Sequence, residues 1–312
     1  MPTTGRVACI GECMIELSER PDGTLIRSFG GDTLNTALYL ARLGVPTDYV
    51  TALGADAFSD AMITAWADEG IGTSLVVRVP GRLPGLYLIR TDAAGERQFH
   101  YWRDSAPVRQ LFLLAETAAL EAGVCRAALV YLSGITLSLF DAPGRERLFA
   151  LLGRARQAGA RIAFDTNFRP RGWPDPAEAC RAFSRALACA DLVFASVEDH
   201  ALLYGDAEPG AVLASLQAAR VEEAVIKLAV PACLVVADGR SERVAAPPVD
   251  MVADTTAAGD SFAAAYIAAR YHGAAPKAAA RAGHRLAGTV VRHRGAIISR
   301  AAMPSPSHAA EA

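Results

Sequence analysis

The chain has 312 residues, of which 52% are hydrophobic, enough to bury a large core as one α/β domain with elaborations or as two domains. Its 31 Lys and Arg residues against 33 Asp and Glu residues give a formal net charge of -2, without the basic excess typical of nucleic-acid-binding or membrane-surface proteins. The N-terminus has no basic stretch followed by an apolar one, and the longest apolar runs fall far below the ~20 residues of a membrane span. We therefore expect a soluble, cytoplasmic protein with a small-molecule partner and with neither nucleic acid nor membrane as a partner.

The first third of the chain contains strand patterns that do not all fit a parallel sheet. They are VACIGECMIEL (7–17), TLIRSF (24–29), LPGLYLIRT (83–91) and ERQFHYWR (96–103). The last two are joined by DAAG and predict a β-hairpin. We place these strands, with part of the first one, in a small β lid drawn from about residues 10–30 and 80–105. The lid would cover the carboxyl edge of the main sheet, where open α/β sheets hold ligands.

Short apolar runs then alternate with helical patterns long enough for crossover helices. The runs are VYLSGI (130–135), ARIAFDTN (160–167), DLVFAS (191–196) and AVIKLA (224–229). This βαβ pattern predicts a mostly parallel sheet with helices on both faces. We expect one domain over residues 1–300 and a mobile tail over 301–312.

The cysteines are scattered in apolar surroundings without C-x-x-C spacing. They are Cys9, Cys13, Cys125, Cys180, Cys189 and Cys233. Buried, reduced thiols are therefore expected in preference to disulfides or a metal site.

Several nucleotide-binding motifs are absent from the sequence. Its two lysines, Lys227 and Lys277, do not follow a glycine, so there is no G-x-x-x-x-G-K-[ST] loop. The G-x-G-x-x-G fingerprint, H-E-x-x-H and the H-R-D and D-F-G pair are absent as well. These absences disfavour a Walker-type site, a nicotinamide dehydrogenase and a protein kinase.

The stretch DTTAAGDSF (254–262) lies between an extended run and an apolar helical run. Ala257, Ala258 and Gly259 carry almost no side chain, so the backbone N–H groups of this turn can approach an anion, and the following helix directs its positive end at the same point. Asp260 falls in the first helical turn, where a carboxylate can accept the proton of a hydroxyl that attacks phosphorus. The alternative interpretation of Asp260 is a helix cap.

Two motifs carry a family resemblance. Asp254-Thr-Thr-Ala-Ala-Gly-Asp260 resembles the D-T-x-[GA]-[GA]-G-D signature of the ribokinase-like (PfkB) carbohydrate kinases, and Phe29-Gly-Gly-Asp-Thr-Leu-Asn35 resembles their N-terminal glycine-pair motif. Further segments are similar to those of members that phosphorylate 2-keto-3-deoxygluconate: IGECMIELSE, GGDTLNTALYLARLG, VTALGADAFSD, LPGLY, YWR, FDTNFRPRGW and RGAII. The resemblance implies a three-layer αβα sandwich with a mostly parallel central sheet and a small β-sheet lid. It also implies ATP-dependent phosphorylation of this sugar acid.

The resemblance assigns roles around the DTTAAGD motif. Asp260 is the expected general base, and the N–H groups of Ala257, Ala258, Gly259 and Asp260 are the expected anion hole for the transferring phosphoryl group. Asp254, with Thr256 and Ser299, either helps to bind a monovalent cation such as K⁺ or, for Asp254 itself, bonds the amides of its own turn. ATP and Mg²⁺ are the expected cofactors, with Mg²⁺ held mainly by ATP phosphates and water.

The expected sugar site combines the glycine pair, the lid and the end of FDTN. Its residues are Gly30, Gly31, Asp32, Asn35, Tyr87, Tyr101, Arg103 and Arg169. The glycines make positive φ available for a tight fold or a hinge, and Asp32 or Thr33 would cap the following helix. Two arginines that reach one pocket suit a carboxylate, because a guanidinium binds it through two parallel hydrogen bonds.

On the nucleotide side, Ser196, Glu198, Lys227 and His284 resemble positions near ATP. Lys227 is followed by LAVPAC, without the glycines of the K-x-G-x-x-G continuation, which leaves phosphate or ribose contacts by that loop open. A kinase for another sugar or sugar acid and a non-catalytic sugar or nucleotide sensor remain alternatives. The sequence leaves open whether the protein is a homo-oligomer.

Overall fold

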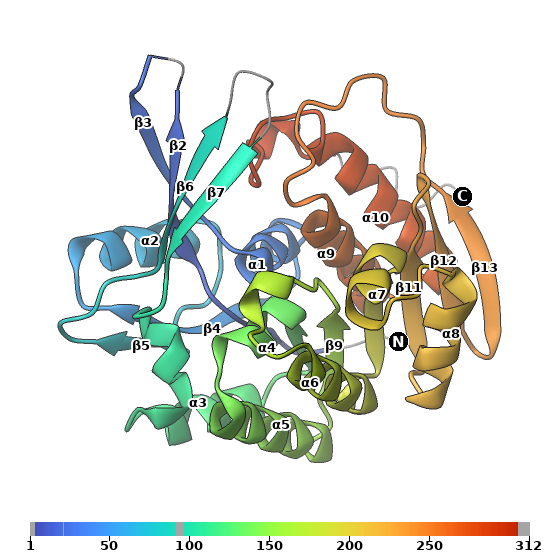
Figure 1. Cartoon of the computed structure of the whole chain (residues 1–312), viewed down its shortest axis with the longest axis horizontal. Coiled ribbons are helices and arrows are strands. Elements are labelled where there is room, and N and C mark those ends of the chain that lie inside the picture. Colours follow the sequence, from blue (N-terminus) through green and yellow to red (C-terminus); the bar gives the residue numbers. More distant parts are fainter. Residues whose placement is uncertain (1–3, 21, 92–96, 305–312) are drawn as a thin grey trace.

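The structure, a computed structural model, describes residues 4–20, 22–91 and 97–304. Within these residues the strands form a nine-stranded sheet and a separate four-stranded sheet (Figure 1). The large sheet has the order β13-β12-β11-β10-β9-β8-β1-β4-β5. Its strands are β1 (Val7–Ile10), β4 (Thr47–Gly54), β5 (Val76–Val79), β8 (Leu129–Ser133), β9 (Arg161–Asp165), β10 (Leu192–Ser196), β11 (Glu223–Lys227), β12 (Ala232–Ala237) and β13 (Arg240–Ala245).

The large sheet is parallel from β11 to β5, whereas β12 pairs antiparallel with β11 and β13 pairs antiparallel with β12. The four predicted middle strands are confirmed as β8, β9, β10 and β11. From β1 the chain proceeds outward to β4 and β5 on one side, and it later continues from β8 to β11 on the other. The direction of winding therefore switches between β1 and β8, and such a switch point opens a crevice at the carboxyl ends of the strands.

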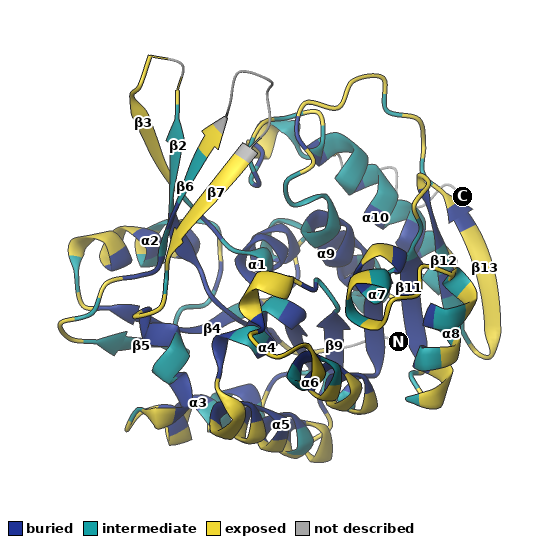
Figure 2. Cartoon of the chain, in the orientation of Figure 1, coloured by how far each residue is buried: buried dark blue, intermediate teal, exposed yellow. Residues whose placement is uncertain are grey.

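Helices cover both faces of this sheet. Successive residues along a strand point to opposite faces, and both faces are buried. In β9, for example, Ile162 and Phe164 pack into one core and Ala163 into the other. The first core is covered by α3 (Thr117–Val124), α5 (Ala142–Gln157), α6 (Pro176–Cys189) and α8 (Pro209–Ala218), and the second by α1 (Asp32–Arg42), α2 (Ala57–Asp68), α9 (Ala258–Tyr271) and α10 (Pro276–Val290). The expected three-layer αβα sandwich is confirmed, and Figure 2 shows its central strands buried.

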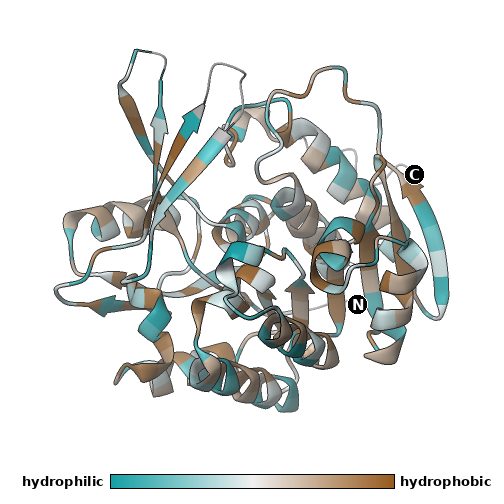
Figure 3. Ribbon diagram, viewed as in Figure 1, coloured by the Kyte–Doolittle hydropathy of each residue, from teal (hydrophilic) through white to brown (hydrophobic). Residues whose placement is uncertain are grey.

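Shorter elements connect these layers. They are α4 (Gly134–Leu139), α7 (Val197–Tyr204) and the 3₁₀ turns η1 (Pro107–Leu113), η2 (Pro170–Gly172) and η3 (Arg300–Ala302). Strand β13, at the edge of the sheet, is mostly hydrophilic (Figure 3), as expected of an edge that must stay in water without pairing further.

The four-stranded sheet has the order β3-β2-β6-β7 and projects from the main body as a lid (Figure 1). It contains β2 (Met14–Glu19), β3 (Leu25–Gly30), β6 (Leu86–Thr91) and β7 (Arg97–Trp102). The predicted hairpin is confirmed as β6 and β7, which pair antiparallel, although its DAAG connection lies outside the described residues. The first predicted strand is divided: β1 enters the large sheet, and β2 enters the lid after the turn at 11–13.

The ends and the cysteines complete the description. All six cysteines are free, and three of them are buried. The tail expected from residue 301 lies outside the described residues from 305 onward, while Arg300–Ala302 form η3. No helix in the part of the chain that is described is long and apolar enough to cross a membrane. The single-domain boundary at residue 300 stays a prediction.

Candidate active site

A cleft of about 410 Å³ lies at the carboxyl ends of the parallel strands. It is lined by Asp32, Ile135, Asp165, Asn167, Arg169, Ser196, Glu198, Asp199, Lys227, Leu228 and the stretch Thr255–Asp260. The fold thus brings the DTTAAGD motif together with the first residue of α1 and with polar residues from the ends of β9, β10 and β11.

The turn before α9 has the shape of an anion cradle. Ala257 adopts a left-handed conformation with φ 60°, and the ladder of α9 begins where the Ser261 N–H donates to the Ala257 carbonyl. The Ala258 N–H donates to the Thr255 carbonyl at 3.2 Å, so it is engaged within the turn. The N–H groups of Gly259 and Asp260 precede the ladder, at the positive end of the helix. A Cβ at Gly259 would lie 3.4 Å from Lys227 Nζ, which places the ammonium group beside this turn.

The carboxylate of Asp260 sits in an environment that favours its protonated form. Asn35 Nδ2 donates to Asp260 Oδ2 at 2.8 Å. Loss of solvent around this carboxylate, with the nearby negative charge of Asp32, raises the pKa of Asp260 to about 8. A carboxyl group with a pKa close to the working pH is suited to proton transfer.

Lys227 is surrounded by carboxylates. Its Nζ lies 3.4 Å from Asp165 Oδ1, and Asp165 is buried at the end of β9. Burial alone would lower the pKa of Lys227, but Asp165, Asp199 and Asp260 together raise it. Burial also raises the pKa of Asp165, against the opposing charge of Lys227. The cleft therefore holds a permanent cation beside the N-terminus of α9.

The Asp32 carboxylate is held in place by residues at the ends of two neighbouring strands, β8 and β9. Its Oδ2 accepts hydrogen bonds from Ser133 Oγ at 2.5 Å and from Asn167 Nδ2 at 2.8 Å. The prediction that Asp32 or Thr33 caps α1 is wrong, because the N-cap is Gly31 and no side chain caps the helix. The Asp32 carboxylate is engaged by β8 and by the loop after β9 instead.

Gly30 and Gly31 allow neighbouring segments to approach closely, and neither residue has the positive φ that was expected to be available there. Gly31 has an extended φ of 176°, and a Cβ there would lie 2.1 Å from the Glu12 carbonyl oxygen. A Cβ at Gly30 would lie 2.6 Å from the Tyr87 hydroxyl. The end of β3 is therefore packed closely against β6, and Gly31 against the turn that leads into β2.

The predicted lid residues share one face of the four-stranded sheet. Tyr87 and Tyr101 are paired in register, with ring centroids 5.9 Å apart, and the Tyr87 hydroxyl donates to Glu16. Arg103, directly after β7, forms an ion pair with Glu12 and is not among the residues that line the cleft.

Arg169 lines the cleft from the loop after β9, with its side chain 60% exposed. Its Nη1 donates to the Phe168 carbonyl at 2.9 Å and lies 3.9 Å from Asp199 Oδ1. Arg103 and Arg169 thus have separate partners in this structure. Their joint binding of one carboxylate stays a prediction.

Asp254 connects the DTTAAGD motif to the RGAII segment. Its carboxylate accepts hydrogen bonds from the N–H and hydroxyl groups of Thr256 and from the Gly295 N–H. The alternative in which Asp254 bonds its own turn is thus present in the structure. Ser299 is exposed at the start of η3, and a K⁺ site at these residues stays a prediction.

The nucleotide-side residues fall into two groups. Ser196 and Glu198 line the cleft, Ser196 as the N-cap of α7 and Glu198 as an exposed residue. His284 does not line the cleft: it packs against Phe262 and lies 3.4 Å from Cys233 Sγ. A nucleotide contact by His284 stays a prediction that this geometry does not support.

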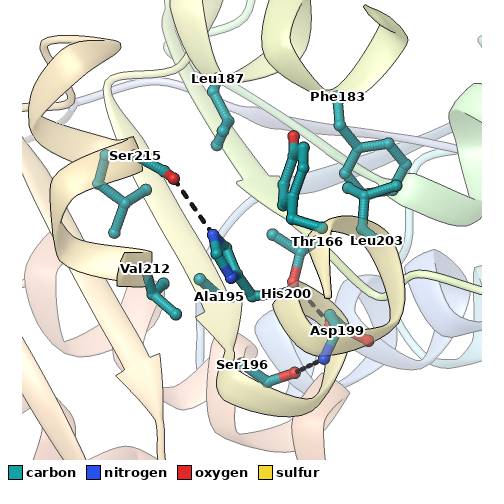
Figure 4. Close-up of a pocket in the computed structure, with 12 residues that line it drawn as sticks. Thr166, Phe183, Leu187, Ala195, Ser196, Asp199, His200, Leu203, Val212 and Ser215 are labelled. Atoms are coloured by element: carbon teal, nitrogen blue, oxygen red, sulfur yellow. Dashed lines mark hydrogen bonds between the residues drawn. The ribbon is translucent and has the colours of Figure 1, made fainter. Parts of the chain in front are cut away.

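A second, mainly apolar cavity lies behind the cleft, between α6, α7 and α8 (Figure 4). It has room for about 20 Å³, which is the space of one water molecule, so it is too small for a substrate. Figure 4 shows how its wall fixes Asp199, whose N–H donates to Ser196 Oγ at 3.0 Å and whose Oδ2 accepts from Thr166 Oγ1 at 2.7 Å.

Sequence reasoning did not assign functions to three polar residues of the cleft, Asp165, Asn167 and Asp199, or to Ser133, which donates to Asp32. The signal was present, because Ser133 and Asp165 end parallel strands, and the other two follow such strand ends closely. Polar residues at the carboxyl ends of neighbouring parallel strands meet at one edge of the sheet.

The three-layer αβα sandwich with its mostly parallel sheet and the smaller four-stranded sheet define a ribokinase-like α/β protein. The chain belongs to the pfkB family of carbohydrate kinases, whose family profile matches residues 4–303.

Individual relatives agree with this assignment. The chain is 43% identical to the 2-dehydro-3-deoxygluconokinase of Dickeya dadantii over 311 residues, covering 97% of this chain and 100% of that protein. It is also 43% identical to the 2-dehydro-3-deoxygluconokinase of Escherichia coli K12, over 96% of this chain and 99% of that one. Among solved structures, a fructokinase with bound ATP from Xylella fastidiosa superposes with a TM-score of 0.83 at 26% identity, covering 97% and 96% of the two chains.

Proposed function

We propose that this protein transfers the γ-phosphoryl group of ATP to 2-keto-3-deoxygluconate, also called 2-dehydro-3-deoxygluconate, giving the 6-phosphate and ADP. The observation that carries the proposal is the position of Asp260, in the first turn of α9 beside the anion cradle and Lys227. The near-full-length similarity to two proteins named 2-dehydro-3-deoxygluconokinase supports the choice of substrate.

Asp260 is the proposed general base. In its deprotonated form it accepts the proton of the sugar hydroxyl as the oxygen attacks phosphorus, and the hydrogen bond from Asn35 keeps its carboxylate oriented toward the cleft. Phosphoryl transfer depends mainly on position and electrostatics, so a base fixed in place contributes without a large movement.

The proposed anion hole consists of the Gly259 and Asp260 N–H groups together with the Lys227 ammonium. Negative charge on the transferring phosphoryl group would meet the positive end of α9 and the Lys227 cation from the same side. Asp165 is proposed to keep Lys227 charged and directed at this point. Mg²⁺ would enter with the phosphates and neutralise part of their charge, and the carboxylates of Asp165 and Asp199 in the same cleft suit it, because Mg²⁺ commonly takes one or two carboxylates beside phosphates and water.

Recognition of the sugar acid is proposed to come from Asp32, Arg169 and the lid. Asp32 is fixed by two hydrogen bonds and can accept from a sugar hydroxyl, while Arg169 is the exposed guanidinium of the cleft. Tyr87 and Tyr101 close the site from above through their shared face of the lid.

The test is ADP release by purified protein across a panel of substrates: 2-keto-3-deoxygluconate, its uncharged methyl ester, and fructose. We expect kcat/KM for the acid to exceed that for the ester by roughly tenfold or more, because a charge-assisted hydrogen bond contributes about 1.5 to 3 kcal/mol. A protein that prefers fructose would instead be a fructokinase, the name that other relatives at 29% identity carry.

A further inference from the structure

Glu12 is a buried acid in the turn between β1 and β2, and the sequence motifs give it no function. Glu12 is 4% exposed to solvent, and it forms an ion pair with Arg103, the first residue after β7. Both Glu12 carboxylate oxygens are shielded from solvent, and so are Nε and Nη2 of Arg103. The pair therefore joins the point where the chain enters the lid to the point where it leaves.

The same acid also packs against Gly31, one of the residues expected at the sugar site. The Glu12 carbonyl oxygen fills the place that a Cβ at Gly31 would need, and a Cβ at Gly85 would lie 2.8 Å from Glu12 Oε1. The two glycines thus let the chain close around Glu12, between the segment before α1 and strand β6.

Stability alone does not explain a charge at this position. Burial raises the pKa of Glu12, and Arg103 and Arg109 oppose this shift while Asp32 adds to it. Replacing a buried ion pair by well-packed apolar residues is often neutral or stabilising, so such a pair is better explained by the position that it imposes on its members.

Arg103 is suited to serve two carboxylates at once. A guanidinium has five N–H donors, and a carboxylate binds along one edge of it. Nη2 forms the ion pair with Glu12 Oε2 and Nε is buried as well, whereas the side chain as a whole is 20% exposed. Nη1 is not among these buried atoms, so we infer that it is the part of the guanidinium left for another anion.

We propose that Glu12 is a positioning residue that holds Arg103 by its buried edge and so presents the other edge to the carboxylate of the sugar acid. This inference rests on the proposed function, because it assumes an anionic sugar under the lid. Without the Glu12 carboxylate, the long Arg103 side chain loses its ion pair and keeps only the weaker contact with the Tyr101 ring, over which its Cζ already lies at 6.0 Å from the centroid.

The experiment compares Glu12→Gln, Arg103→Ala and the double variant on 2-keto-3-deoxygluconate and on its methyl ester. Glu12→Gln keeps the shape of the side chain, so we expect the KM for the acid to rise about tenfold, the size of one charge-assisted hydrogen bond, with little change in kcat. Its kcat/KM for the ester should stay within about twofold. In the Arg103→Ala background, Glu12→Gln should not change the acid-to-ester ratio further, because Glu12 acts through Arg103.

Three results would overturn the proposal: equal losses on acid and ester, a lower KM for the acid, or effects of the two substitutions that multiply. If Glu12→Gln does not fold, Glu12→Asp decides. Aspartate keeps the negative charge on a side chain that is one methylene shorter, so the KM for the sugar acid should rise by less than tenfold. An unchanged KM would refute the positioning role. A wild-type enzyme without preference for the acid over the ester would instead refute the proposed function, and this is seen before any variant is made.

Discussion

At the scale of single residues, the cleft is governed by charges that are partly removed from water. Asp260 is the clearest case, because solvent loss and the charge of Asp32 raise its pKa from the ordinary value of 3.8 to about 8. A base in such a position is available only when the pH is high enough to remove its proton.

The first prediction concerns this pH dependence. Because the free enzyme must lose the proton of Asp260 before it can accept one from the sugar, kcat/KM for the sugar should rise with pH along a limb with an apparent pKa near 8. The measurement is kcat/KM from pH 6 to 9.5. A flat profile over this interval would remove Asp260 from proton transfer in the free enzyme.

The second prediction concerns stability. A carboxyl group whose pKa is raised on folding contributes stability that is fully present below its unfolded pKa and is lost as the pH rises through the folded value. The Asp260 carboxylate should therefore lower the free energy of unfolding of the wild type progressively between about pH 4 and 8. Each pH unit in this interval costs at most about 1.36 kcal/mol. Asp260→Asn avoids this cost, so its melting temperature should exceed that of the wild type at pH 8.5 and approach it at pH 5.

The control for this comparison is Asp68→Asn, which changes an exposed aspartate in α2. It should leave the melting temperature unchanged at both pH values. An Asp260→Asn protein that is less stable than the wild type at pH 8.5 would show that the carboxylate is not desolvated in solution.

At the scale of elements, the start of α9 connects sequence to chemistry. The DTTAAGD motif needs small residues because Ala257 takes a left-handed conformation and because Gly259 lies beside Lys227. The backbone is therefore strained at Ala257, because positive φ is unfavourable for residues other than glycine.

The third prediction follows from this strain and uses one position with two substitutions. Ala257→Gly relieves the left-handed conformation and should raise stability by up to about 1 kcal/mol, with the KM for ATP nearly unchanged. Ala257→Val brings a β-branched side chain into the same conformation and into the cradle, so it should lower the melting temperature and raise the KM for ATP. Equal behaviour of the two variants would contradict the cradle.

The sequence predicted the elements better than it predicted their contacts. The parallel strands and the lid hairpin were readable because short apolar runs and short turns are local patterns. The N-cap of α1 was predicted wrongly because Asp32 is drawn to Ser133 and Asn167, which are far away in the chain. The pairing of Glu12 with Arg103 joins two positions 91 residues apart, and no local pattern encodes such a contact.

At the scale of the whole molecule, the proposed function assigns the chemistry to the large sheet and the closing of the site to the lid. The large sheet supplies Asp165, Lys227 and the cradle of α9 at its carboxyl edge, and the lid supplies Tyr87 and Tyr101. The two sheets meet at the segment 30–32 and at Glu12, where glycines permit close contact.

The central claim is that Asp260 drives phosphorylation of a sugar acid, and the most direct test is ADP release from 2-keto-3-deoxygluconate by the wild type and by Asp260→Asn side by side. We predict that the wild type forms ADP only when the sugar acid is present. In the variant, kcat should be lower by roughly 10² to 10⁴, because general-base catalysis contributes about this factor, and the KM for the sugar acid should be nearly unchanged. Near-normal turnover by Asp260→Asn, or no ADP from the wild type with this sugar acid, would contradict the claim.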